Sequence, residues 1–423
     1  MKKKDKDKKT FFMKKNVKSL KRKKNKEGKD ETVREIVIER DNGFNTVEVI
    51  VIIIVSVFFG IVVGCILSSS RTFGTEVSSE VQEIITTYES IVENYYGDID
   101  KKELLDSAVS GMISNLDDPY SIFMDSTDTE LFNETVDGSF VGIGVTIEYI
   151  DGSFRIAGII EGSPAQDAGL KEDDYIVKID GKDVKSMNLE EMSKLIKGDK
   201  GSYVSLSVIR NEEEVTFKVK REIVEVLSVS SKFVDNEIGY ISIDSFASNT
   251  SEQFSVQLKQ LEKQGVSSLI IDVRNNPGGR LRQVNKMLDL FFDKKTILYR
   301  IETKNTIEKV YAQKSDVRSY PVVILVNNGS ASASEILASC FQENYDKATI
   351  LGGVTYGKGT IQKTVELSSG ASIKYTTQKW LTSKGSWINE KGVIPDVIVD
   401  QNDNNSVGEE DVQLQKAIEI LKK

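Results

Sequence analysis

Residues 326–336 carry the first groups that could do chemistry, because an apolar strand there runs into a turn of small residues and then a helix. Glycine, serine and alanine permit a tight turn and let a substrate backbone approach closely. A serine at such a turn lies near the N–H groups that open the helix, and their positive end favours a developing oxyanion. Serines also cap helices, so this segment alone leaves a nucleophile and a helix cap as alternatives.

Two further segments carry groups that would complement a reactive serine. Residues 270–279 end an apolar strand in Gly278 and Gly279, whose consecutive backbone N–H groups could form an anion-binding concavity. Residues 354–362 place Lys358 between two glycines. Burial lowers the pKa of a lysine from about 10.4 toward neutrality, and the neutral amine can accept a serine proton. A solvated lysine between turn glycines is the alternative.

The composition excludes the commoner catalytic units. The 423 residues include no histidine, which rules out Ser-His-Asp and Cys-His catalysis and zinc sites built on histidine. The two cysteines, Cys65 and Cys340, cannot make a disulfide framework. Paired catalytic carboxylates and a phosphate-binding loop find no support, which disfavours glycan and nucleotide chemistry. We expect no metal and no cofactor.

The amino-terminal part of the chain is basic and precedes an apolar run. Residues 1–30 hold 15 lysines and arginines against 4 aspartates and glutamates, although the whole chain carries −9. The 19 uncharged residues at 49–67 approach the length of about 20 that crosses a bilayer as a helix. Because lysine and arginine mark cytoplasmic flanks, we expect a cytoplasmic tail at 1–46, one transmembrane anchor at 47–68 and extracytoplasmic domains after it.

Other interpretations of this region are weaker. A basic run can bind nucleic acid, but its position before an apolar run favours the membrane, and we expect no nucleic-acid partner. A buried helix of a soluble domain would not be apolar on every face. The sequence around Cys65 loosely resembles a lipoprotein processing site, although the basic region is longer than a signal peptide allows. A cleaved and lipidated signal stays open beside an uncleaved anchor.

The hydrophobic pattern divides the rest of the chain. Residues 75–135 are predicted to form an amphipathic helical segment that reaches a proline turn at 117–120. Short β-like runs with one helix occupy 136–222. Alternating strands and helices at 223–400 predict an α/β layer with parallel strands. Residues 401–423 are predicted to be a polar linker and a short helix.

Seven stretches of the sequence, in this order, resemble the carboxy-terminal processing proteases, also called tail-specific serine peptidases. They are LDDPYS (116–121), FVGIGV (140–145), GSPAQDAGL (162–170), RNNPGG (274–279), GSASASE (329–335), GKGTIQ (357–362) and GVIPD (392–396). The resemblance covers roughly residues 80–400. It implies an α/β peptidase core of mixed sheet and helices, a small β-rich PDZ domain and the N-terminal helical segment, after one transmembrane helix.

The resemblance also implies which residues act. The family's nucleophile lies three residues before a glutamate, which matches Ser332, and its general base matches Lys358. The glutamine that orients this base matches Gln362. Backbone N–H groups that bind the oxyanion are expected at Ala333 and at Gly278 or Gly279. We expect Glu335 to support the site without being required.

The β-rich segment would supply substrate recognition. Gly142, Ile143, Gly144 and Val145 stand where PDZ domains bind a peptide carboxylate through backbone N–H groups. The peptide adds as a strand beside this edge, against the helix expected at 189–196. A free C-terminus would dock there before the chain reaches the catalytic serine.

The expected protein is therefore a membrane-anchored serine endopeptidase with a Ser-Lys dyad. Its expected partners are exported or membrane proteins with free C-terminal tails, and the membrane itself through residues 47–68; a homo-oligomer stays open. The alternative is a catalytically inactive, membrane-tethered PDZ scaffold. The presence of Ser332, Lys358 and Gln362 disfavours it.

Overall fold

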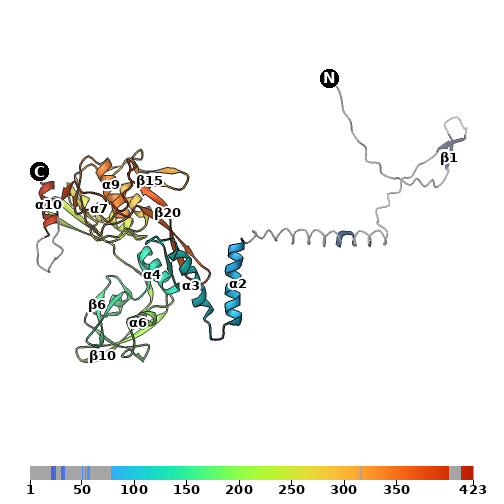
Figure 1. Cartoon of the computed structure of the whole chain (residues 1–423), viewed down its shortest axis with the longest axis horizontal. Coiled ribbons are helices and arrows are strands. Elements are labelled where there is room, and N and C mark those ends of the chain that lie inside the picture. The colour runs from blue at the N-terminus through green and yellow to red at the C-terminus, as the bar shows by residue number, and fades with distance from the viewer. Residues whose placement is uncertain are drawn as a thin grey trace, which may run out of the picture. The chain divides into compact units, whose positions relative to one another are not determined.

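The computed structural model describes residues 21–24, 30–33, 50, 53, 55–57, 78–314, 317–399 and 411–422 (Figure 1). The chain divides into two compact units, Met1–Ile99 and Asp100–Lys423. The first unit contains β1 (Lys21–Lys24), β2 (Asp30–Val33), which pairs with β1 in antiparallel, and helix α2 (Ser79–Asn94).

The predicted membrane anchor at 47–68 lies largely outside the described residues. The structure describes only 50, 53 and 55–57 of it, and these are helical. Within the described ranges, no helix combines the length and the apolar character needed to cross a bilayer. Most of the predicted tail at 1–46, and residues 401–410 of the predicted linker, also lie outside. The anchor therefore stays a prediction.

The second unit begins with two helices and a short strand: α3 (Lys101–Ser114), β3 (Ile122–Met124) and α4 (Ser126–Asp137). Asp100 and Asp125 cap the two helices by accepting hydrogen bonds from backbone N–H groups of their first turns. Strand β3 pairs in antiparallel with β20 (Ser372–Leu381). The helical prediction for 75–135 missed this strand, because three residues are too few to show a strand pattern.

A small β-rich domain follows. Its strands are β4 (Ser139–Gly142), β5 (Val145–Ile150), β6 (Ser153–Ile159), β7 (Tyr175–Ile179), β8 (Lys182–Asp183), β9 (Tyr203–Arg210), β10 (Glu213–Lys220) and β11 (Glu222–Glu225), and its helices are α5 (Pro164–Ala168) and α6 (Leu189–Ile196). The main sheet has the order β10-β9-β7-β6-β5, so β5 is an edge strand, and β4 pairs with β11. Side chains of the sheet and of both helices, such as Ile156, Ala165 and Met192, share one buried core.

The rest of the second unit is built on a six-stranded sheet of order β12-β13-β14-β17-β18-β21. Its strands and helices are β12 (Val229–Asp235), β13 (Ile238–Ile243), α7 (Thr250–Lys263), β14 (Ser268–Asp272), α8 (Leu281–Leu288), β17 (Val322–Val326), α9 (Ala333–Asn344), β18 (Ala348–Gly352), β21 (Val397–Ile398) and α10 (Val412–Leu421). Strand β12 is antiparallel to β13, and the other neighbours are parallel. The predicted mixed sheet with helices is confirmed.

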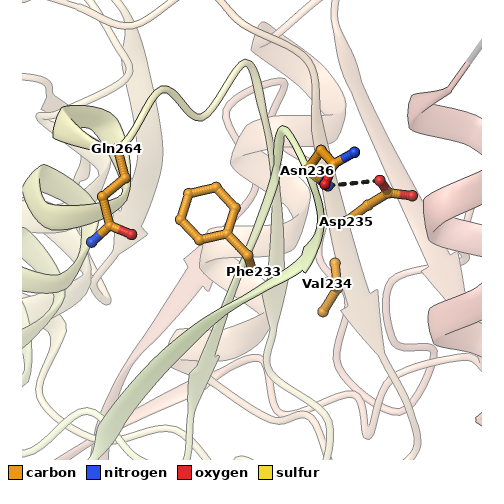
Figure 2. Close-up of a pocket in the computed structure, with 5 residues that line it drawn as sticks. All are labelled: Phe233, Val234, Asp235, Asn236 and Gln264. Atoms are coloured by element: carbon orange, nitrogen blue, oxygen red, sulfur yellow. Dashed lines mark hydrogen bonds between the residues drawn. The ribbon is translucent and has the colours of Figure 1, made fainter.

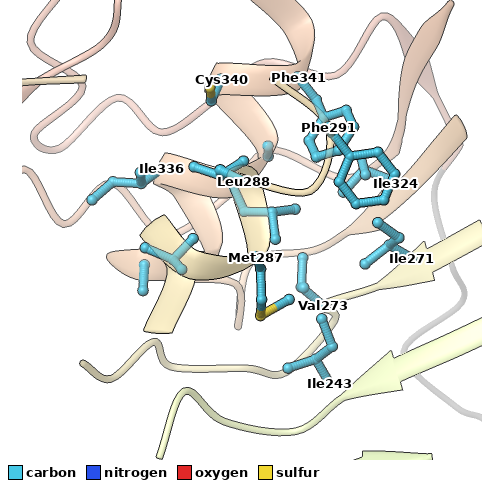
Figure 3. Packing of buried hydrophobic residues seen from close by; sticks show 14 of the residues in the cluster. Ile243, Ile271, Val273, Met287, Leu288, Phe291, Ile324, Ile336, Cys340 and Phe341 are labelled. Carbon is cyan, nitrogen blue, oxygen red and sulfur yellow. The ribbon is translucent and has the colours of Figure 1, made fainter. Parts of the chain in front are cut away.

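Both faces of this sheet are covered. Every residue of β14 and of β17 is buried, as expected for parallel strands between two layers of helices. Ile271 and Ile324 pack with Phe291 and Phe341 in a core that α7, α8 and α9 complete (Figure 3). The alternate residues of the same strands pack with Ala417 of α10 on the other face.

A second sheet was not predicted. It consists of β16 (Ile307–Tyr311), β15 (Ile297–Glu302), β20 and β19 (Thr360–Glu366) in that order, and β3 pairs with β20 at its side. Adjacent strands of this sheet are antiparallel. Through β3, the segment before the PDZ-like domain becomes part of the peptidase-like half of the chain.

Candidate active site

The loops that carry the predicted catalytic residues follow three neighbouring strands of the main sheet. Strand β14 leads to Gly278, β17 leads to Ser332, and β18 leads to Lys358. These strands are parallel and adjacent in the sheet. Because the carboxyl ends of parallel strands meet at one edge, this topology brings the three loops together, at the place where open α/β sheets bind ligands.

Ser332 occupies a strained turn between β17 and α9. Its φ of 54° and ψ of −109° lie outside the regions that non-glycine residues usually adopt, and such strain clusters at functional sites. The neighbouring serines are fully buried, and their hydroxyls donate to backbone carbonyls, Ser330 to Val273 at 2.7 Å and Ser334 to Asn276 at 2.9 Å. Ser332 is only half-buried, so its hydroxyl is the one of the three that a substrate could reach.

The carboxylate of Glu335 joins the serine loop to the lysine loop. Glu335 is fully buried. One of its oxygens accepts from the N–H of Ser332 at 2.7 Å and from the N–H of Lys358 at 2.9 Å. The other accepts from the N–H of Gly357 at 2.7 Å and from the hydroxyl of Thr355 at 2.6 Å. Bonds to an ionised acceptor are the stronger kind, so Glu335 fixes the spacing of the two loops.

The glycine loop packs directly against the serine. A Cβ atom added to Gly278 would lie 2.9 Å from the Cβ of Ser332 and 3.1 Å from the nitrogen of Ala333. The N–H of Gly278 already donates to the side-chain oxygen of the buried Asn276 at 2.9 Å. Over the described residues, the N–H groups of Gly279 and Ala333 have no protein acceptor. Gly279 is therefore a freer donor than Gly278.

Lys358 is half-buried, and its backbone is held firmly. Its carbonyl accepts from the indole N–H of Trp380 at 2.7 Å. Its ammonium nitrogen lies 4.7 Å from the centre of the Tyr120 ring, a cation–π distance. Within the described part of the chain, no hydrogen bond joins this nitrogen to the hydroxyl of Ser332. The structure thus brings both loops together but directs the lysine side chain toward Tyr120.

Burial and neighbouring charges set the charge state of Lys358. Burial lowers the pKa of Lys358, and the nearby charge of Lys374 lowers it further. The carboxylates of Asp118 and Glu335 act in the opposite direction, and the net effect is a lowered pKa. A lysine in this environment loses its proton more readily than a solvated one.

Gln362 is not joined to Lys358 by a hydrogen bond among the residues described. Its amide nitrogen donates to the hydroxyls of Thr360 at 2.9 Å and Thr376 at 3.1 Å. Thr376 lies on β20, where its N–H donates to the hydroxyl of Ser121 at 3.2 Å. Gln362 therefore belongs to a polar network that reaches the turn before β3.

Sequence reasoning assigned no role to several residues around Lys358, among them Asp118, Tyr120, Asn276, Thr355 and Lys374. The stretch 116–121 matched the family pattern although it lies about 200 residues before the serine, and this was the one available signal. Asp118 accepts from the hydroxyl of Ser121 at 2.5 Å and from the N–H of Tyr120 at 3.2 Å. These bonds shape the turn that presents the Tyr120 ring to Lys358.

The predicted peptide-binding residues form the start of the β5 edge. Gly142 ends β4, where it pairs with Glu222 of β11. The carbonyls of Ile143 and Gly144 accept from Ala165 and Ile160. Gly144 has a φ of +83°, and a Cβ there would lie 2.3 Å from the side chain of Ser163, so this position requires glycine. Val145 opens the edge strand itself.

A recess elsewhere on the second unit does not qualify as the active site. It is lined by Phe233, Val234, Asp235, Asn236 and Gln264 (Figure 2). The recess lies where β12 turns into β13, at the amino end of β13. The loops that carry the predicted catalytic residues lie at the opposite, carboxyl ends of the parallel strands. In the described ranges, no cluster of three or more cysteine, aspartate or glutamate side chains could hold a metal ion.

Three parts of the chain match models of known protein families. Residues 237–399 match Peptidase family S41, and residues 141–220 match the PDZ domain. Residues 66–128 match the Activating protease CtpB N-terminal domain. The first match contains all three predicted catalytic residues, and the third contains Tyr120.

The chain is 41% identical, over 321 residues, to the carboxy-terminal processing protease CtpA of Bacillus subtilis (strain 168); the match covers 75% of this chain and 69% of that protein. This chain belongs to the carboxy-terminal processing proteases. It is 37% identical over 354 residues to CtpB of the same organism, covering 82% of this chain and 73% of that protein. Among solved structures, the photosystem II D1 C-terminal processing protease aligns at 27% identity over 77% of this chain and 94% of that chain, with a TM-score of 0.45.

Family membership makes this carboxy-terminal processing protease a serine-type peptidase, and hence a hydrolase. The predicted α/β peptidase core and the predicted PDZ domain are confirmed. The roles of individual residues and the membrane anchor are not decided by these matches.

Proposed function

We propose that Ser332 and Lys358 are the catalytic dyad of this protease, and that it cleaves proteins recognised through their C-terminal tails. The observation that carries the proposal is the Glu335 carboxylate, which accepts hydrogen bonds from the N–H groups of both residues. It holds together two loops that are 26 residues apart in the sequence. The strained backbone of Ser332 and the lowered pKa of Lys358 support the same assignment.

The chemistry uses Lys358 as the base that histidine provides elsewhere. The neutral amine accepts the proton of Ser332, and the serine oxygen bonds to the scissile carbonyl carbon. The N–H groups of Ala333 and Gly279 donate to the resulting oxyanion. When the C–N bond breaks, the lysine returns the proton to the leaving amine, and a water molecule then hydrolyses the ester by the same proton transfers.

This mechanism requires Lys358 to change partners. Its nitrogen lies over the ring of Tyr120 in the structure and must turn toward the hydroxyl of Ser332 before it can accept the proton. Rotation about side-chain bonds is sufficient for such a change, since Glu335 and Trp380 hold only the backbone of Lys358. Gln362 would then orient the amine from the polar network on β19 and β20.

Single substitutions test the dyad. We expect Ser332→Ala and Lys358→Ala each to lower kcat/KM by about a thousandfold or more, measured on a peptide with an apolar, free C-terminus. The exposed Ser386 and Lys363 provide matched controls, and Ser386→Ala and Lys363→Ala should cleave normally. A wild-type rate in either dyad variant would refute the assignment. A wild-type chain that binds such peptides but cleaves none would instead support an inactive PDZ scaffold.

We also propose that residues 47–68 anchor the protease in a cell membrane, with the basic tail in the cytoplasm and the catalytic part outside. The uncharged run at 49–67 and the lysines before it support this arrangement. Carbonate extraction of membranes tests it. The full chain should stay with the membrane pellet, and a chain that begins at residue 78 should be released. Release of the full chain would contradict the anchor.

A further inference from the structure

Strand β20 carries a second half-buried lysine near the proposed dyad. The ammonium nitrogen of Lys374 lies 5.1 Å from the centre of the Phe132 ring of α4. Burial lowers the pKa of Lys374, and in the described part of the chain no carboxylate offsets this effect. A half-buried charge without an opposite charge costs free energy. The contact with the Phe132 ring is favourable for the charged amine, but no ion pair among the described residues accounts for a lysine at this position.

The strand register places Lys374 on the catalytic face of the second sheet. Paired residues in antiparallel strands share a face, and so do residues two apart in one strand. Thr376 pairs with Gln362, so Lys374 lies on the same face as Gln362. On its other side, Lys374 pairs with Ile122 of β3, two residues after Tyr120. The strand thus brings Lys374 to the turn that contacts Lys358.

The charged groups that face Lys358 come from three different elements. Lys374 on β20 disfavours a proton on Lys358, whereas Asp118 in the turn before β3 and Glu335 on α9 favour one. Glu335 also holds the two loops together, so its charge cannot be removed without disturbing their spacing. Two carboxylates therefore favour the charged form of a base that must be neutral, and Lys374 is the group that opposes them.

The phenol of Tyr120 beside Lys358 adds no charge to this balance between Lys374 and the two carboxylates. Burial, together with a hydrogen bond to Tyr356, raises the pKa of Tyr120 to about 12. Tyr120 therefore stays neutral over the range in which Lys358 has to lose its proton. Its ring adds a favourable contact for the charged amine, which makes an opposing positive charge more important.

We propose that Lys374 is a positioning residue of this protease, and that its positive charge keeps Lys358 in the neutral form that accepts the proton of Ser332. The inference rests on the proposed dyad. It adds a second lysine that does not touch the substrate but acts through the first. A positive charge beside a lysine lowers the pKa of that lysine, and this is a known way to activate an amine.

The dependence of kcat/KM on pH tests the inference. Activity should rise with pH as Lys358 loses its proton. Lys374→Met removes the repelling charge, so the pKa of Lys358 should rise and the ascending limb should move to higher pH. We expect kcat/KM to fall by about three- to tenfold on the acid side of the limb and to approach the wild-type value at alkaline pH. Lys374→Arg keeps the charge and should keep the limb in place.

Removal of the opposing carboxylate provides a second, independent measurement. Asp118→Asn keeps an oxygen that can accept from Ser121 but loses the negative charge, so the limb should move to lower pH. The double variant should lie between the two single variants. If Lys374 and Asp118 were needed only for packing, their variants would lower the rate at every pH. They would not shift the ascending limb in opposite directions.

Two outcomes would overturn the inference. The first is a limb that stays at the wild-type pH in Lys374→Met although thermal unfolding shows a folded protein. The second is an equal shift in Lys374→Arg. Failure of the dyad itself is distinguishable, because Lys358→Ala would then retain activity. If Lys358→Ala is inactive and the limb does not respond to Lys374, only the role of Lys374 is wrong.

Discussion

Glu335 shows how one buried side chain can organise the proposed active site without touching a substrate. All four of its hydrogen-bond donors belong to Ser332 or to the loop that carries Lys358. A buried carboxylate is stable only when such donors replace water. The carboxylate and the two loops therefore depend on each other.

We expect Glu335→Ala to lower the free energy of unfolding by about 3 kcal/mol, because it leaves buried donors without an acceptor. Its kcat should fall more than its KM changes, since the loops lose their spacing, yet it should remain more active than Ser332→Ala. Urea denaturation and steady-state kinetics measure both effects. Glu335→Gln keeps one acceptor oxygen and serves as the milder comparison. Wild-type stability in Glu335→Ala would show that the clamp is not needed.

The sequence predicts the residues of this site unevenly. Ser332 and Lys358 lie in short glycine-rich stretches, so their local pattern and the family resemblance were enough to propose them. Tyr120 and Lys374 lie about 250 residues apart in the sequence, and the pairing of β3 with β20 brings their segments together. No local pattern encodes that pairing. The contact between the Lys358 side chain and Tyr120 therefore could not be predicted from the sequence.

At the scale of the element, the glycine loop after β14 is the one proposed to bind the substrate oxyanion. Gly278 has a φ of +102°, and its approach to Ser332 leaves no room for a side chain. The side chain of Asn276 holds this loop in place. Its amide nitrogen donates to the carbonyl of Ile243 at 2.8 Å, and its oxygen accepts from the N–H of Gly278. The backbone of this loop, and not the chemistry of its side chains, therefore approaches Ser332, and among the described residues the N–H of Gly279 has no protein acceptor.

We expect Gly278→Ala to reduce kcat by about a hundredfold or more, because the added methyl group would displace the loop from Ser332 and misplace the oxyanion donors. KM should change less. Gly265→Ala is a matched control, since Gly265 also has a positive φ but has open space around it. Comparable kcat values for the two variants would argue against a close approach at Gly278.

The helices and strands also show which elements the hydrophobic pattern of the sequence can predict. Strands β14 and β17 are buried throughout, and the sequence predicted both. Helix α6 begins and ends where it was expected, and α10 lies in the segment predicted to hold a short helix. The second sheet escaped prediction because its strands mix buried and exposed residues irregularly, and most of β16 is exposed. Half-buried strands on a mixed face leave a weak periodic signal.

At the scale of the whole molecule, the PDZ match and the peptidase match occupy separate stretches of one chain. The PDZ match ends at residue 220, and the peptidase match begins at 237. Strand β5 leaves one side unpaired in the PDZ sheet, and a peptide can add there as a further strand. Gly144, just before this edge strand, cannot be replaced without strain, because a side chain there would collide with Ser163.

If this edge captures a free carboxylate, the charge of the substrate's C-terminus should matter at a distance from the bond that is cleaved. We expect a peptide with an apolar, free C-terminus to be cleaved with a KM about tenfold lower than the same peptide ending in an amide, because hydrogen bonds to a charged acceptor are worth about 1.5–3 kcal/mol. The kcat values should be similar, since neither peptide differs at the reacting bond. Ser332→Ala protein, which is expected not to cleave, should bind the two peptides with the same ratio of Kd values. Equal KM values for the acid and the amide would remove carboxylate docking from the recognition step and leave the dyad assignment unaffected.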